Sequence, residues 1–121
     1  MNILIIDDNC EITTMLSKYF TLKGHTCYVS NDGKNGLLMM ENSQFHVVLL
    51  DLAMPDFSGR DLINHLHDHG KMRNHTVITL TASSLSDIDA TYLMEKGVHS
   101  VLKKPIDPDT LLEYLMKVTA K

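Results

Sequence analysis

The 121-residue sequence lacks an apolar run long enough to cross a membrane. Its first residues, MNILIIDD, also lack the basic start and the small-residue cleavage site of a signal peptide. Cysteine is scarce: Cys10 and Cys27 fall in different predicted elements, so we expect both thiols to be reduced and Cys27 to lie in the core. We therefore expect a cytoplasmic protein with no membrane association.

Basic residues are too few for a typical nucleic-acid-binding protein. The chain has 11 Lys and Arg against 15 Asp and Glu, a formal net charge of -4, and no cluster of Lys or Arg. It contains no internal repeat, linker or low-complexity segment. These features predict one globular domain over residues 1–121, whose partners are proteins or small anions carried with a metal, not nucleic acids.

Short apolar runs alternate with helical patterns along the whole chain. Val47 to Leu50 form an unbroken apolar run, which is typical of a strand buried on both faces of a parallel sheet. The pattern predicts strands at 3–6, 26–30, 47–50, 76–81 and 100–103, and helices at 10–23, 34–42, 59–69, 86–96 and 108–118. This order predicts an α/β fold, a doubly wound five-stranded parallel sheet with five helices.

Side-chain patterns also predict the helix ends and faces. Asp8 or Asn9 is a candidate cap for the first helix, and Ser84 or Ser86 for the fourth. The helical stripes place Met15 and Met116 toward the core.

Polar residues that can handle a phosphoryl group follow the predicted strands. Asp7 and Asp8 follow the first strand and Asp51 follows the third, while the fourth ends in Thr81 and Lys104 follows the fifth. The carboxyl ends of parallel strands are where ligands bind in such sheets. Three carboxylates predict a Mg²⁺ site, and a hydroxyl and an ammonium opposite them suit phosphoryl oxygens. Asp51 is then the natural nucleophile.

These motifs, in this order, resemble the receiver domain of two-component response regulators over essentially the whole chain. They are the pair Asp7-Asp8, the segment DLAMPDFSG with Asp51 first and Pro55 and Gly59 in place, the turn Thr81-Ala82, and the pair Lys104-Pro105.

The resemblance implies a fold and a set of roles. The fold is flavodoxin-like with strand order 2-1-3-4-5. Asp51 would accept a phosphoryl group from a sensor histidine kinase, a histidine phosphotransfer protein or a small phosphodonor, and Lys104 would pair with that group. Asp7, Asp8, Asp51 and the backbone carbonyl of Ala53 would bind Mg²⁺. Ala82 and Ala53 would border the phosphoryl group.

It further implies a phosphorylation-controlled switch. Thr81 would move toward the phosphoryl group, and the face of the fourth helix, fifth strand and fifth helix would shift to alter contacts with a downstream protein. Val101 stands where many receivers carry Tyr or Phe, so the aromatic half of this switch is missing. A cis Lys104-Pro105 bond is implied, as is a monomer or a phosphorylation-dependent dimer. We expect no room for an output domain between the first strand and the last helix.

Three other interpretations compete with this one. A Mg²⁺-dependent phosphohydrolase with an aspartyl-phosphate intermediate would need a second aspartate two residues after Asp51, where Ala53 stands. A flavin carrier on the same fold would bring its phosphate against clustered carboxylates. A receiver-like scaffold that is never phosphorylated would have little reason to keep the whole pocket.

The seven histidines form two groups in the sequence, and the first group lies near the end of a predicted helix: His65, His67 and His69. His65 and His69 are one helical turn apart, a spacing that can bind Zn²⁺, but polar residues also suit the end of a helix, and we favour that interpretation. The residues that each precede a predicted strand are expected at the edge opposite the carboxylates: His25, His46, His75 and His99.

Overall fold

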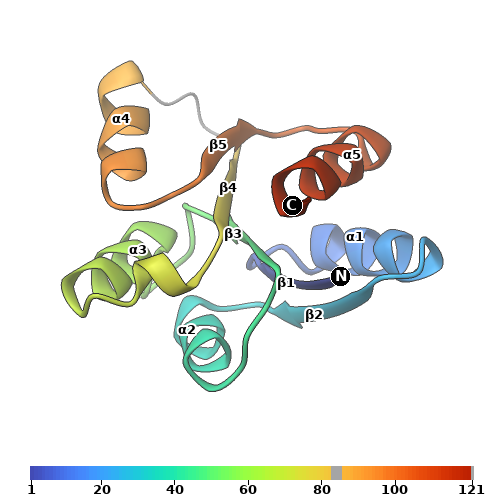
Figure 1. The fold of residues 1–121 in the computed structure, drawn as a ribbon, viewed down its shortest axis with the longest axis horizontal. Helices are drawn as coiled ribbons and strands as arrows, with labels where there is room; N and C mark the ends of the chain where they lie inside the picture. The colour runs from blue at the N-terminus through green and yellow to red at the C-terminus, as the bar shows by residue number, and fades with distance from the viewer. Residues whose placement is uncertain (83–85, 121) are drawn as a thin grey trace.

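The computed structural model of the protein describes residues 1–82 and 86–120. These residues form five strands, five α-helices and one short 3-10 helix (Figure 1). In chain order they are β1 (Asn2–Ile6), α1 (Cys10–Leu22), β2 (Thr26–Ser30), α2 (Gly33–Asn42), β3 (Val47–Asp51), α3 (Gly59–Asp68), η1 (Met72–Asn74), β4 (Val77–Thr81), α4 (Asp87–Glu95), β5 (Ser100–Lys103) and α5 (Pro108–Thr119).

The five strands form one parallel sheet in the order β2-β1-β3-β4-β5. Figure 1 shows α1 and α5 on one face of this sheet and α2, α3 and α4 on the other. The predicted fold class, strand order and five helices are therefore confirmed.

Two hydrophobic clusters lie on opposite faces of the sheet, because successive side chains of a strand point to opposite faces. In β1, Ile3 and Ile5 pack toward α1 and α5, whereas Leu4 and Ile6 pack toward α2 and α3. The central strand β3 is buried along its whole length because helices cover both of its faces. This double burial explains why the strands appear in the sequence as unbroken apolar runs, and it fixes the strand ends that carry the polar residues.

Side-chain caps define where the helices begin. Asn9, not Asp8, caps α1, because its side chain accepts hydrogen bonds from the backbone of Glu11 and Ile12. Ser86 caps α4 by accepting from the backbone of Asp89, while Ser84 lies outside the described residues. Asp8 is thereby left with its carboxylate at the strand edge.

Three expectations about the core are wrong or incomplete. Met15 is 45% exposed and Met116 52% exposed, so neither fills the core. Thr13 is 2% exposed in place of Met15, and its hydroxyl is satisfied by the backbone oxygen of Cys10 and the side chain of Asn31. Cys27 is only partly buried, although both cysteines are free thiols as expected.

None of the helices in the described part of the chain combines the length and the apolar character that spanning a bilayer requires.

Candidate functional site

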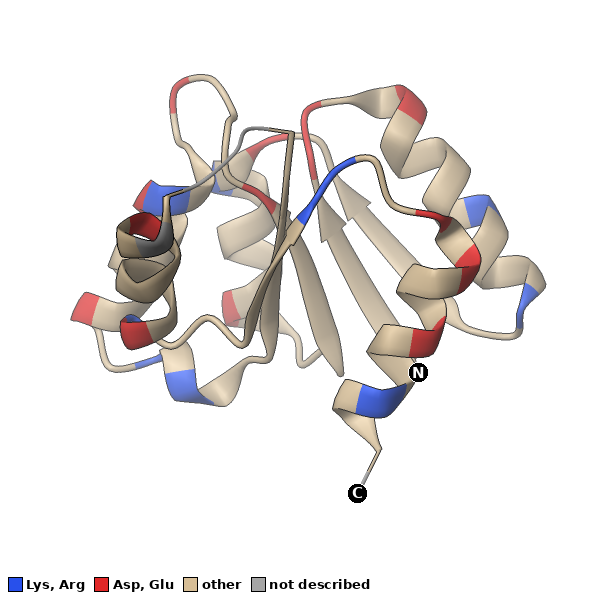
Figure 2. Ribbon diagram, turned by 90° about the horizontal axis from the view of Figure 1, so that it is seen from above, with Lys and Arg blue, Asp and Glu red and all other residues tan. Residues whose placement is uncertain are grey.

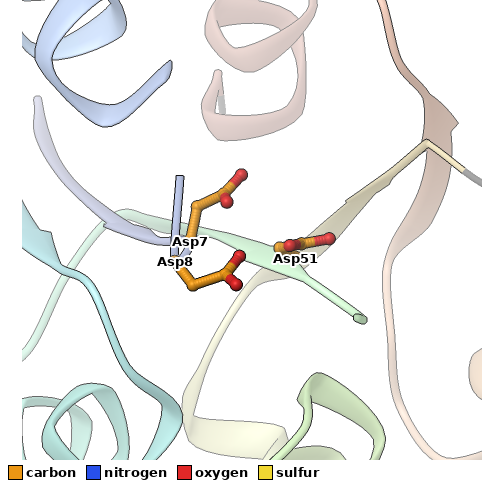
Figure 3. A group of neighbouring side chains, drawn as sticks. All are labelled: Asp7, Asp8 and Asp51. Carbon is orange, nitrogen blue, oxygen red and sulfur yellow. The ribbon is translucent and has the colours of Figure 1, made fainter. Parts of the chain in front are cut away.

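The carboxylates predicted to meet do meet, at the carboxyl ends of two adjacent strands. Ile6, the last residue of β1, is in register with Leu50 of β3, so Asp7 and Asp51, which follow them, lie side by side at this edge of the sheet. Figure 3 shows Asp7 and Asp8 leaving the end of β1 on the side where Asp51 lies. In Figure 2, acidic and basic segments of the ribbon come together at the edge toward which the strands point.

The three carboxylates are close enough to share one cation. One oxygen from each of Asp7, Asp8 and Asp51 lies within 4.8 Å of the others. Asp7 is 3% exposed and Asp51 6% exposed, whereas Asp8 is open to solvent. Buried carboxylates at this separation repel one another, and an all-oxygen donor set suits a hard cation such as Mg²⁺.

Lys104 provides the positive charge on the opposite side of the site. Its ammonium donates to Asp7 Oδ2 at 2.6 Å and lies 3.9 Å from Asp51 Oδ1. Its backbone N–H donates to the carbonyl of Thr81 at 2.8 Å, which ties the loop after β5 to the end of β4. The Lys104-Pro105 peptide bond is cis. Residues 97 positions apart in the chain thus form one charged pair.

Asp51 remains incompletely neutralised by these contacts. Burial and the nearby charge of Asp7 raise the pKa of the Asp51 carboxyl from 3.8 to about 6, with a smaller contribution from Asp8. Lys104 and the backbone N–H of Ala53, which donates to Asp51 Oδ1 at 3.3 Å, act in the opposite direction. The site therefore favours any ligand that brings further positive charge to Asp51.

The backbone around the carboxylates is held by close contacts. The backbone N–H of Gly59 donates to the carbonyl of Leu52 at 3.1 Å. A Cβ at Gly59 would lie 2.3 Å from the carbonyl oxygen of Asp51. Glycine at position 59 is therefore required by the close approach of α3 to the end of β3.

Hydrogen bonds hold both the side chain and the backbone of Asp7. Its carboxylate accepts from the backbone N–H of Asn9, and its carbonyl accepts from the side chain of Asn31. Sequence reasoning missed Asn31, although an asparagine directly after β2 at the same sheet edge was an available signal.

The remaining predicted site residues occupy different environments. Thr81 is buried at the end of β4, and Ala82 and Ala53 are exposed in the loops after β4 and β3. Val101, in β5, is partly buried and packs against the cluster under α2, α3 and α4. Asp51, Asp7, Asp8 and Lys104 are thus the charged group that the structure gathers, with Thr81 linked to it through the backbone of Lys104.

The histidines stand apart from this site. The four that precede strands lie at the opposite, amino-terminal edge of the sheet, as their positions predicted: His25, His46, His75 and His99. Among the side chains that the structure describes, the aspartate group is the one set of three or more His, Cys, Asp or Glu ligand atoms close enough to hold a metal together.

Comparisons with known proteins agree with this geometry. The family described as the response regulator receiver domain matches residues 3–116. A transcriptional regulatory protein, the CpxR homolog of Haemophilus influenzae, is 32% identical over 110 residues, which are 91% of this chain and 46% of that protein. The chain spans about half the length of the curated relatives it matches.

Solved structures share the fold over nearly the whole chain. The receiver domain of the Francisella response regulator 1452 has a TM-score of 0.87 at 25% identity, with 98% of this chain and 95% of that chain covered. The chemotaxis protein CheY4 of Vibrio cholerae has a TM-score of 0.85 at 25% identity, with 97% of each chain covered.

Proposed function

Because this chain is a receiver domain of the two-component response regulator family, we propose that Asp51 accepts a phosphoryl group and that this reaction controls a signalling switch. The observation that carries the proposal is the group of three carboxylates facing the Lys104 ammonium at one sheet edge. Residues 1–121 would form a single receiver domain. Receiver domains are signalling switches and not classical enzymes, so the chain would promote only its own phosphorylation and dephosphorylation.

Mg²⁺ is the cofactor that best fits the donor set. The ligand group found among the described residues consists of three carboxylates and includes no imidazole or thiolate. Burial and the charge of Asp7 raise the pKa of the Asp51 carboxyl, and a bound cation would oppose this effect. Asp7, Asp8, Asp51 and the Ala53 carbonyl would hold the ion. When bound, Mg²⁺ would neutralise charge on the carboxylates and on the phosphoryl oxygens.

The proposed reaction is nucleophilic transfer. A carboxylate oxygen of Asp51 forms a bond to phosphorus while the P–N bond of a phosphohistidine breaks, and its electron pair stays on the donor's imidazole. The donor would be a sensor histidine kinase, a histidine phosphotransfer protein or, in place of phosphohistidine, acetyl phosphate. Loss of the group would follow when water attacks phosphorus and releases inorganic phosphate.

Lys104 and Thr81 would stabilise the phosphoryl group after transfer. Lys104 now pairs most closely with Asp7, and an added anion on Asp51 would draw its ammonium away from that partner. The Thr81 hydroxyl would donate to a phosphoryl oxygen, and the small side chains of Ala82 and Ala53 leave space beside it. Because Thr81 and Lys104 would both contact the phosphoryl group, phosphorylation would be coupled to the end of β4 and to the loop after β5.

The output would be a change of protein contacts on the face of α4, β5 and α5. Val101 cannot act as an aromatic switch residue, so movement of Thr81 and of α4 would carry the change. We expect a downstream protein target, a cytoplasmic location, no nucleic-acid or membrane binding by this domain, and a monomer or a phosphorylation-dependent dimer.

Intact-protein mass after incubation with acetyl phosphate tests the proposal. The wild type should gain the mass of one phosphoryl group in Mg²⁺ but not in EDTA, and hydroxylamine should remove it because acyl phosphates are labile. Asp51→Asn should gain nothing. Asp56→Asn is the matched control, since Asp56 lies in the loop after β3 with a φ of 65°, which asparagine tolerates.

Two results would contradict the proposal. An adduct that persists in Asp51→Asn would move the acceptor elsewhere. A wild type that binds Mg²⁺ but never gains the phosphoryl mass would show that the chain is a receiver-like scaffold that is not phosphorylated.

A further inference from the structure

We propose that His65 and His69, at the carboxyl-terminal end of α3, form a binding site for a divalent transition metal ion of the Ni²⁺, Cu²⁺ and Zn²⁺ class. The site is separate from the carboxylate group at the strand ends. It does not depend on the proposed phosphorylation.

The two imidazoles are already neighbours in the structure. Their ring centroids lie 4.2 Å apart with an angle of 26° between the ring planes. The residues are four positions apart on one helix, so they share a face. His69 is exposed and His65 is partly exposed, which lets a metal ion and its water ligands reach both rings and lets the rings tilt toward a common ion.

The hydrogen bonds of His69 prepare it as a ligand. His69 Nδ1 lies 2.7 Å from the carbonyl oxygen of His65. A carbonyl oxygen only accepts, so Nδ1 carries the hydrogen and Nε2 presents a free lone pair. Metal-binding histidines typically donate their other ring N–H to a carbonyl or carboxylate, because this bond fixes the ring and raises its basicity.

The local charge also favours a cation. The last carbonyls of a helix carry partial negative charge, and no Lys or Arg lies in the last turn of α3. His67 is two residues from either ligand and therefore points away from their shared face. Its Nδ1 lies 3.2 Å from Asp68 Oδ1. Because His67 belongs to the same helix end but does not share the face of His65 and His69, it serves as an internal control.

The chemistry of the ligands separates this site from the aspartate site. Imidazole suits Zn²⁺, Cu²⁺ and Ni²⁺, whereas Mg²⁺ prefers oxygen. The described residues hold no group of three such ligands here, so water would complete the coordination of the ion. α3 begins close to Asp51 and its 10 residues span about 15 Å, which keeps the two sites apart.

Calorimetric titration of the untagged, EDTA-treated protein with Ni²⁺ and Zn²⁺ tests the proposal, with excess Mg²⁺ present to occupy the aspartate site. We expect one ion per chain, bound more weakly as the pH falls because protons compete for the imidazoles. His65→Gln and His69→Gln should each weaken binding by about tenfold or more, while His67→Gln should bind as the wild type does.

Line broadening by Ni²⁺ in amide NMR spectra of the wild type locates the ion without any substitution. Broadening centred on residues 64–70 supports the site. The proposal is overturned if broadening centres on another segment, if His69→Gln binds as tightly as the wild type, or if Asp8→Asn abolishes the binding.

Discussion

The ammonium of Lys104 lies 2.6 Å from Asp7 Oδ2 but 3.9 Å from Asp51 Oδ1. The one lysine of the site is therefore closest to the carboxylate that is not the proposed acceptor. Asp51 is left with a raised pKa of about 6, which reflects burial and the charge of Asp7. Recruitment of positive charge to Asp51, by Mg²⁺ and by movement of Lys104, is the central expectation for this site.

Lys104→Met should destabilise the Mg²⁺-free protein. The substitution removes the partner of a buried carboxylate, so the free energy of unfolding should fall by about 3 kcal/mol at neutral pH. Added Mg²⁺ should recover more stability in this variant than in the wild type, because the ion no longer competes with Lys104 for Asp7. Urea unfolding with EDTA or Mg²⁺ measures both effects, and Lys18→Met, an exposed lysine on α1, is the control. Equal loss in the two variants would contradict this pairing.

Asp51→Asn should stabilise the Mg²⁺-free protein in a pH-dependent way. The folded-state pKa of Asp51 is raised from 3.8 to about 6, so the folded protein holds this proton more tightly than the unfolded chain. The cost of ionising Asp51 is absent below pH 3.8 and complete above pH 6. The variant should therefore gain up to about 3 kcal/mol over the wild type at pH 7, from 1.36 kcal/mol per pKa unit.

Urea unfolding in EDTA between pH 4 and pH 7.5 measures this difference, which should shrink toward zero at the acidic end. A difference that is constant across this range would show that the charge of Asp51 is not its cause.

Gly59→Ala should disturb the end of β3. An added Cβ would lie 2.3 Å from the carbonyl oxygen of Asp51 and 2.8 Å from Cα of Leu52, and both are backbone atoms that cannot move aside alone. We expect a loss of about 2 kcal/mol or more in the free energy of unfolding and weaker Mg²⁺ binding. Gly24→Ala is the comparison, since φ is +91° there but the space is open, so it should cost about 1 kcal/mol and leave Mg²⁺ binding unchanged.

Thr81→Ala should leave phosphorylation of Asp51 intact but prevent the structural change on the face of α4 and β5. The acceptor remains, so acetyl phosphate should still modify the protein, but the hydroxyl that would follow the phosphoryl group is gone. Beryllofluoride, a phosphoryl mimic, should then perturb amide resonances around Asp51 but no longer those of α4 and β5. Thr81→Ser keeps the hydroxyl and should respond as the wild type does. A full response in Thr81→Ala would place the switch in another residue.

Strand-end chemistry was predictable because the sheet is parallel and buried. The apolar runs at 3–6 and 47–50 end in Asp7, Asp8 and Asp51, and a parallel sheet brings such ends to one edge. The contacts of Lys104 were not predictable, because its choice between Asp7 and Asp51 depends on the path of the loop after β5.

The helix faces were predicted less well, for a physical reason. Thr13 is buried because two hydrogen bonds satisfy its hydroxyl, whereas a pattern that counts apolar residues assigns the core position to Met15. One of these hydrogen bonds comes from the side chain of Asn31, which lies in the loop after β2 and far from Thr13 in the sequence. The 3-10 helix η1 was missed because three residues are too few to show a period.

The most direct test locates the phosphoryl group itself. The protein is phosphorylated with acetyl phosphate in Mg²⁺ and then reduced with borohydride, which converts an aspartyl phosphate to homoserine. The chain is digested, and its peptides are sequenced by mass spectrometry. We predict homoserine at position 51 and intact aspartate at positions 7, 8 and 56. Homoserine at another aspartate, with Asp51 unchanged, would contradict it.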